Sequence, residues 1–144
     1  MKKNVIISIK GVQSYNDDNG EVELITIGDL YKKNNDFYVV YKESELTGLE
    51  GKTVLKIEKD KLTLTRNNRA SQMIFEPNIP HTNHYDMGDG AFQVIVKTRK
   101  LDTVFSESGG NINVKYDLNI NNFIVSQNYL DISVKEVPNV DKSN

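Results

Sequence analysis

The sequence predicts an all-β protein, folded as a single antiparallel β-barrel of about eight to ten strands. Hydrophobic side chains recur at every second residue from Val5 to Val134, which is the period of a strand with one face on a core. No stretch of comparable length follows a helical period, and turn residues interrupt the alternation at short intervals. These observations together indicate a sheet without crossover helices.

The first half of the chain contains alternating segments separated by turns rich in Asn, Asp and Gly. The run Asp17-Asp18-Asn19-Gly20 is expected to end the first strand, because Asn-Gly tolerates the positive φ of a tight hairpin. Gly28 is expected to kink the second strand, and Asn34-Asn35-Asp36 to turn the chain into the third. Residues 43–50 fit either a helical turn or an irregular bend. The alternating segments of this half cover residues 5–9, 21–33, 37–41, 53–57 and 62–64.

In the second half, prolines and glycines divide the chain in the same way. Pro77 and Pro80 are expected to end a strand, since each removes a backbone donor from the ladder. Gly88-Asp89-Gly90 and Asn121-Asn122 are expected to form turns, and residues 106–110 a loop. The alternating segments of this half cover residues 73–75, 81–86, 92–96, 112–120 and 124–134. Residues 1–137 are therefore expected to form one domain, followed by a polar tail over 138–144.

A closed barrel is favoured over a sandwich. Several of the expected strands exceed ten residues, and closing the sheet removes the exposed edges of such long strands. The phase of the apolar residues then predicts the core, which consists of Phe37, Val39, Leu62, Phe75, Phe92, Val94, Val114, Leu118 and Ile132.

Length, charge and cysteine content restrict the functional classes. A chain of 144 residues with a formal net charge of −2 suits one domain and lacks the basic field of a nonspecific nucleic-acid binder. There is no Cys, so disulfides and thiolate metal sites are excluded. The apolar run after Met1 is too short for a signal peptide, and no segment approaches the roughly 20 apolar residues of a membrane span. We therefore expect a cytoplasmic protein with no nucleic-acid and no membrane partner.

Six polar residues fall on the otherwise apolar inner face, each toward the end of an apolar stripe. The end of a stripe is where the mouth of a barrel lies, and small barrels hold side chains or one small ligand there. Two of the six, Glu43 and Arg66, carry opposite charges that suit an internal pair or an ionic ligand. The candidate ligand-binding residues are Gln13, Glu43, Arg66, Thr98, Ser126 and Asn128.

Motifs for catalysis, metal or cofactor binding are missing. His81 and His84 stand three apart, which on a strand sends their side chains to opposite faces and argues against a metal site. Gly88-Asp89-Gly90 lacks the third glycine and the following helix of a dinucleotide loop. Clusters such as Lys97, Arg99 and Lys100 are interpreted as solvated surface. The sequence thus predicts no catalytic residue, no metal ligand and no cofactor.

Several landmarks resemble the YwiB-like family, which comprises uncharacterised bacterial proteins with a calycin-type β-barrel. The matching segments are residues 7–13, 43–51, 72–76, 81–85 and 109–118, in order along nearly the whole chain. The resemblance implies a calycin or lipocalin-like barrel and no defined activity. The chain departs from the family at Met87-Gly88-Asp89-Gly90, so the role of that turn is left open. It also lacks Trp, and with it the Gly-x-Trp feature of typical lipocalins.

Three functional classes follow, in order of preference. The first is a barrel that binds a small amphipathic or polar ligand in its cavity without catalysis. The second is an interaction or assembly module, such as a homodimer, because Ile25 and Ile27 lie opposite in phase to Val22 and Leu24 and make strand 21–33 apolar on both faces. An enzyme is the third. The identity of a ligand, the oligomeric state and the pathway do not follow from the sequence.

Overall fold

The computed structural model describes residues 2–15, 18–42, 51–66, 71–86, 91–121 and 123–137. Within these ranges the protein is built from ten strands. They are β1 (Lys2–Tyr15), β2 (Asp18–Lys33), β3 (Asp36–Lys42), β4 (Lys52–Ile57), β5 (Leu62–Arg66), β6 (Ser71–Phe75), β7 (His81–Asp86), β8 (Ala91–Ser106), β9 (Gly109–Ile120) and β10 (Phe123–Glu136).

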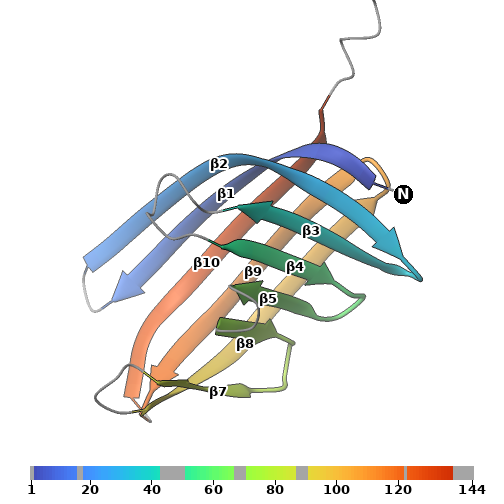
Figure 1. Ribbon diagram of the computed structural model, residues 1–144. Helices are drawn as coiled ribbons and strands as arrows, with labels where there is room; N and C mark the ends of the chain where they lie inside the picture. Colours follow the sequence, from blue (N-terminus) through green and yellow to red (C-terminus); the bar gives the residue numbers. More distant parts are fainter. Residues whose placement is uncertain are drawn as a thin grey trace, which may run out of the picture.

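All ten strands belong to one antiparallel sheet in the order β6-β5-β4-β3-β2-β1-β10-β9-β8-β7. Each strand pairs with its neighbour in the chain except at β6 and β7, which are the two ends of the sheet, and the first strand pairs with the last. In Figure 1 the long strands β8, β9 and β10 cross behind the shorter β3, β4 and β5, so the sheet curls into a nearly closed barrel. The antiparallel barrel predicted from the alternation is confirmed.

The β1–β2 hairpin is longer than the strands beside it. Its ladder runs from Lys2 paired with Tyr31 to Tyr15 paired with Asp18, whereas β3 pairs with β2 only from Gly28 onward. The hairpin therefore extends beyond β3 in Figure 1. The expected turn at Asn19-Gly20 was placed too late. Both residues lie inside the ladder, because the pairing of β1 with β2 continues as far as Tyr15 and Asp18.

The core lies between the two crossing layers of the sheet. Val39, Leu62, Phe75, Val114 and Ile132 are buried as predicted, while Phe37 and Leu118 are only partly buried against the core. Val94 is also only partly buried, since it lies near the start of β8 and faces the end of the barrel. The side chain of Phe92 lies outside the described part. The remaining buried apolar residues are Val5, Ile7, Leu30, Tyr41, Leu55, Ile57, Leu64, Val96, Ile112, Tyr116 and Val134.

Gly28 lies where β2 is closely approached by its two neighbouring strands, β1 and β3. A Cβ atom built there would lie 2.4 Å from the Val40 carbonyl oxygen and 2.7 Å from Ile7 Cδ1. Both separations are far below van der Waals contact, so only glycine fits this position. The kink expected at Gly28 thus corresponds to a close backbone approach, which fixes how β2 crosses the core.

The barrel has a seam between β6 and β7. Among the described residues, no ladder joins these strands, and a single parallel bridge connects Pro77 to Thr98 of β8. Pro77 and Pro80 have no backbone N–H, so the chain between the strands is poorly suited to a hairpin ladder. Side chains complete the closure instead: the Phe75 ring packs edge-on against Tyr116 of β9, with 4.7 Å between ring centroids.

Two bulges interrupt the ladders of β9. The register with β8 shifts between Thr98 and Lys100, and the register with β10 shifts between Ile124 and Ser126. A bulge adds one residue to one strand and redirects its side chains. The shift at Arg99 keeps both Thr98 and Leu101 on the inner face, although they are three residues apart. A sequence pattern that assumes a strict period of two does not detect this change of phase.

The outer face of β1 and β2 carries a short apolar patch. Ile25 and Ile27 are 62% and 71% exposed, and Ile6, directly opposite Ile27, is 39% exposed. The outward orientation of Ile25 and Ile27 agrees with the sequence analysis. Val22, on the inner face, is exposed as well, because it lies in the part of the hairpin that extends beyond β3. In the described part of the chain, no helix has the length and apolar character needed to cross a membrane.

Candidate ligand site at the end of the barrel

Four inner-face residues form one continuous row across adjacent strands. Gln13 of β1 pairs with Asn128 of β10, Asn128 pairs with Tyr116 of β9, and Tyr116 pairs with Thr98 of β8. Directly paired residues of an antiparallel ladder point to the same face. Gln13 is exposed, Asn128 is half-buried, and Tyr116 and Thr98 are buried, so the row leads from solvent into the barrel.

Ser126 is the shared hydrogen-bond acceptor beside this row. Its hydroxyl oxygen accepts from Asn128 Nδ2 at 2.9 Å and from Gln13 Nε2 at 3.3 Å. Ser126 is 2% exposed and lies on the inner face, in phase with Asn128 and Leu130. The two amide contacts orient Gln13 and Asn128 and leave the Ser126 hydroxyl hydrogen available for donation.

The buried end of the row carries polar groups with few protein partners. Thr98 is 7% exposed, and its hydroxyl has no hydrogen-bond partner among the described residues. An unsatisfied buried hydroxyl costs about 1–3 kcal/mol, which a ligand or a water molecule recovers by bonding to it. Beside it, burial raises the pKa of the Tyr116 phenol to about 12, with the positive charge of Arg66 acting in the opposite direction. Tyr116 is therefore a neutral hydrogen-bond donor at physiological pH.

Arg66 approaches the row from the opposite wall of the barrel. It continues the inner-face stripe of Leu62 and Leu64 on β5 and pairs in register with Thr53, which is 1% exposed. The positive charge of Arg66 lowers the pKa of Tyr116, which indicates that the two side chains lie near each other inside the barrel. The predicted partner of Arg66, Glu43, lies outside the described residues.

Of the six residues proposed from the sequence, the structure thus brings Gln13, Ser126 and Asn128 into direct contact. Thr98 belongs to the same row, since it pairs with Tyr116, and the charge of Arg66 lowers the pKa of Tyr116. Sequence reasoning did not include Tyr116 among the candidate residues. A signal was available, because Tyr116 continues the phase of Ile112 and Val114 and is the only member of that stripe with a polar tip.

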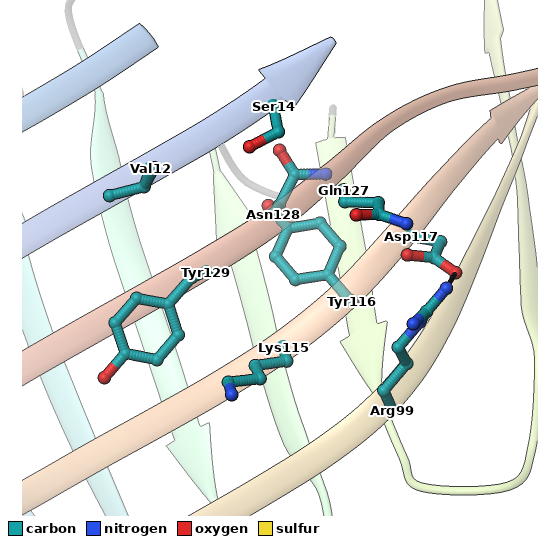
Figure 2. Close-up of a pocket in the computed structure, with 9 residues that line it drawn as sticks. All are labelled: Val12, Ser14, Arg99, Lys115, Tyr116, Asp117, Gln127, Asn128 and Tyr129. Atoms are coloured by element: carbon teal, nitrogen blue, oxygen red, sulfur yellow. Dashed lines mark hydrogen bonds and ion pairs between the residues drawn. The ribbon is translucent and has the colours of Figure 1, made fainter. Parts of the chain in front are cut away.

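A depression of about 190 Å³ lies on the opposite, outer face of these same strands (Figure 2). Most of its lining residues alternate with the inner row along β1, β9 and β10, and Arg99 contributes from β8. Only Asn128, of the six predicted residues, also borders it. The full lining consists of Val12, Ser14, Arg99, Lys115, Tyr116, Asp117, Gln127, Asn128 and Tyr129.

An ion pair forms one wall of this depression. Arg99 Nε donates a hydrogen bond to Asp117 Oδ2 at 2.9 Å, and Arg99 Nη2 lies 2.8 Å from the same oxygen; Figure 2 marks this contact with a dashed line. Asp117 is only 9% exposed, and its other carboxylate oxygen has no partner among the described residues. Arg99 is the extra residue of the β8 bulge, which is how it reaches Asp117. The sequence analysis treated Arg99 as solvated surface, because a bulge is invisible to a period-two pattern.

His81 forms a contact with the carboxylate of Glu76. His81 Nε2 lies 2.9 Å from Glu76 Oε1, across the turn that contains the two prolines. The side chain of His84 lies outside the described part. No group of three or more His, Cys, Asp or Glu side chains suited to a metal ion occurs among the described residues.

The topology and the polar row define the class of the protein: a small, nearly closed antiparallel barrel with a polar inner end. The chain belongs to the family described as Domain of unknown function (DUF1934), which it matches over residues 7–132. It is also similar to the crystal structure of the ywiB protein from Bacillus subtilis, with 19% identity, a TM-score of 0.81 and coverage of 95% of this chain and 94% of that one. At this identity the similarity shows the fold. No curated protein matches the chain significantly.

Proposed function

We propose that the protein binds a small amphipathic molecule at the polar inner end of the barrel, without catalysis, in the cytoplasm. The observation that carries the proposal is the row of directly paired residues Gln13, Asn128, Tyr116 and Thr98, which leads from solvent to a buried hydroxyl without a described partner. A mostly apolar interior with a few convergent polar groups is the usual form of a small-molecule site.

The chemistry of the row favours a ligand whose polar head accepts hydrogen bonds. Tyr116 is a neutral donor, and the hydroxyl groups of Thr98 and Ser126 are free to donate. The nearby positive charge of Arg66 favours a carboxylate over a cationic head. Beyond the row, Leu118 and Leu130 are partly buried apolar neighbours that suit an aliphatic body.

The experiment uses a series of linear carboxylic acids, from butyrate to decanoate, together with the matched alcohols. Binding is followed by methyl resonances of Leu118 and Leu130 in nuclear magnetic resonance titrations. We expect saturable shifts that strengthen with chain length, and tighter binding of each acid than of its alcohol. Native mass spectrometry of the purified protein provides a second measurement, because a retained molecule adds its mass.

The matched variants are Thr98→Val and Thr103→Val, both on β8. Thr98 belongs to the row, whereas Thr103 pairs with Ile112 farther along the strand. Thr98→Val is expected to weaken acid binding several-fold, and Thr103→Val to leave it unchanged. The proposal is wrong if no acid produces saturable shifts, or if the two variants bind equally.

A homodimer through the outer patch of Ile6, Ile25 and Ile27 remains the alternative prediction. Three exposed isoleucines favour contact with a second copy, but a stable interface requires about 800 Å² from each partner, which is more than such a short patch supplies. Sedimentation of the wild-type chain and of Ile25→Ser/Ile27→Ser tests it. A dimer that dissociates in the double variant favours this alternative.

A further inference from the structure

Two lysines face each other on the outer surface of the barrel. Lys100 of β8 pairs directly with Lys115 of β9, and Lys115 pairs directly with Tyr129 of β10. Like charges directly opposite each other in a ladder are destabilising. The arrangement therefore costs stability in the isolated protein, and an anion bound between the two ammonium groups removes that cost.

The bulge in β8 concentrates cations at this place. In a regular strand the side chains of Arg99 and Lys100 would point to opposite faces, but the bulge lets both lie on the outer face. There Arg99 forms an ion pair with Asp117, and Lys100 forms one with Asp102. Bulges are over-represented beside functional sites because they re-aim side chains in this way.

The charges at this place are not balanced. The distance from Lys100 Nζ to Asp102 Oδ2 is 3.4 Å, and Arg99 is held by Asp117. Lys115 forms no ion pair with a described carboxylate, and its Nζ lies over the Tyr129 ring, 5.9 Å from the centroid. Lys115 is thus a cation without a described carboxylate partner, in a protein whose formal net charge is −2.

A second depression, of about 210 Å³, opens beside Lys115, and we call it the cationic depression. It is lined by Lys100, Asp102, Asn113, Lys115 and Tyr129. The Tyr129 hydroxyl donates to Asn113 Oδ1 at 2.9 Å, which orients the amide and leaves its Nδ2 hydrogens available. Two ammonium groups and an amide donor thereby border one small space, together with the Asp102 carboxylate that contacts Lys100.

We propose that the cationic depression binds a phosphate group. Lysine ammonium groups bind phosphate as point charges, and an amide donor adds direction to the contact. The proposal is independent of the ligand at the inner row, because the two sites lie on opposite faces of β9 and β10. Figure 2 shows Lys115 and Tyr129 side by side at this part of the outer face.

The test uses inorganic phosphate and pyrophosphate, with sodium chloride adjusted to hold the ionic strength constant. Amide resonances, including the Asn113 side chain, are followed in the full-length protein. We expect saturable shifts centred on Asn113 and Lys115, with pyrophosphate binding more tightly because of its greater charge. Lys115→Gln is expected to weaken binding by about tenfold or more, as expected for loss of a charge-assisted contact. Lys33→Gln, at an exposed lysine of β2, serves as the charge-matched control.

Thermal unfolding distinguishes a binding role from a structural one. Without phosphate, Lys115→Gln should melt no lower than the wild type, because it removes the like-charge contact. With phosphate, the wild type should gain stability and Lys115→Gln should not. If Lys115→Gln fails to fold, Lys100→Gln replaces it. Equal binding by the Lys115 and Lys33 variants, or the absence of saturable shifts at constant ionic strength, overturns the proposal.

Discussion

Phe75 packs edge-on against Tyr116, with 4.7 Å between their ring centroids, and so joins β6 to β9 across the seam of the barrel. The two residues are far apart in the sequence, and no ladder joins β6 to β9 in the described part of the sheet. The contact closes the apolar core and at the same time positions the Tyr116 phenol at the polar row. Stability and the candidate ligand site therefore depend on the same pair.

Removing the Phe75 ring should destabilise the fold strongly. Phe75 is fully buried, so Phe75→Ala is expected to lower the free energy of unfolding by about 3–5 kcal/mol, through lost transfer energy and a residual cavity. Urea denaturation measures the change. Phe123→Ala is the control, because Phe123 is 75% exposed and should change stability by less than about 0.5 kcal/mol. A small loss at Phe75 would show that β6 is not part of the core.

The raised pKa of Tyr116 predicts a loss of stability at high pH. Burial raises this pKa from 10.0 to about 12, so ionisation is easier in the unfolded chain than in the folded one. The resulting stabilisation, about 2–3 kcal/mol, is fully present below pH 10 and is lost as the pH rises toward 12. Comparing wild type with Tyr116→Phe by urea denaturation at pH 8 and pH 11 isolates this effect. A difference between the two proteins that is independent of pH would contradict it.

The close approach at Gly28 predicts a strong effect of adding one methyl group. Gly28→Ala places a Cβ atom against the Val40 carbonyl and the Ile7 side chain, and we expect a loss of about 1–3 kcal/mol from overpacking. Gly20→Ala, on the same strand, is the matched control, since no atom lies within 4 Å of its Cβ position. Melting temperatures of the two variants should therefore differ clearly. Equal values would mean that β2 crosses the core differently.

The pair of Arg99 and Asp117 predicts a coupled effect of two substitutions. Arg99→Gln leaves the nearly buried Asp117 carboxylate without its partner and is expected to cost about 1–3 kcal/mol. In Arg99→Gln/Asp117→Asn the stranded charge is removed, and part of the loss should be recovered. Chemical denaturation of both single variants and the double variant gives the coupling energy. Additive losses would show that the two side chains do not interact in solution.

The sequence by itself determined the class of fold and part of the core. Alternation of apolar residues is a local property of each strand, so Val39, Leu62 and Val114 were identified as buried without knowledge of their partners. Thr98, Ser126 and Asn128 were assigned to the inner face in the same way, and their ladders agree with that phase.

Only the tertiary structure decided which of these residues meet. The row through Gln13, Asn128, Tyr116 and Thr98 depends on the register of three separate ladders, and register is set by pairing between distant segments. The bulge at Arg99 likewise depends on the partner strand, so the contact with Asp117 and the opposed lysines had no local signal. A period of two specifies the face of a side chain, whereas its neighbours on that face are specified by how the sheet closes.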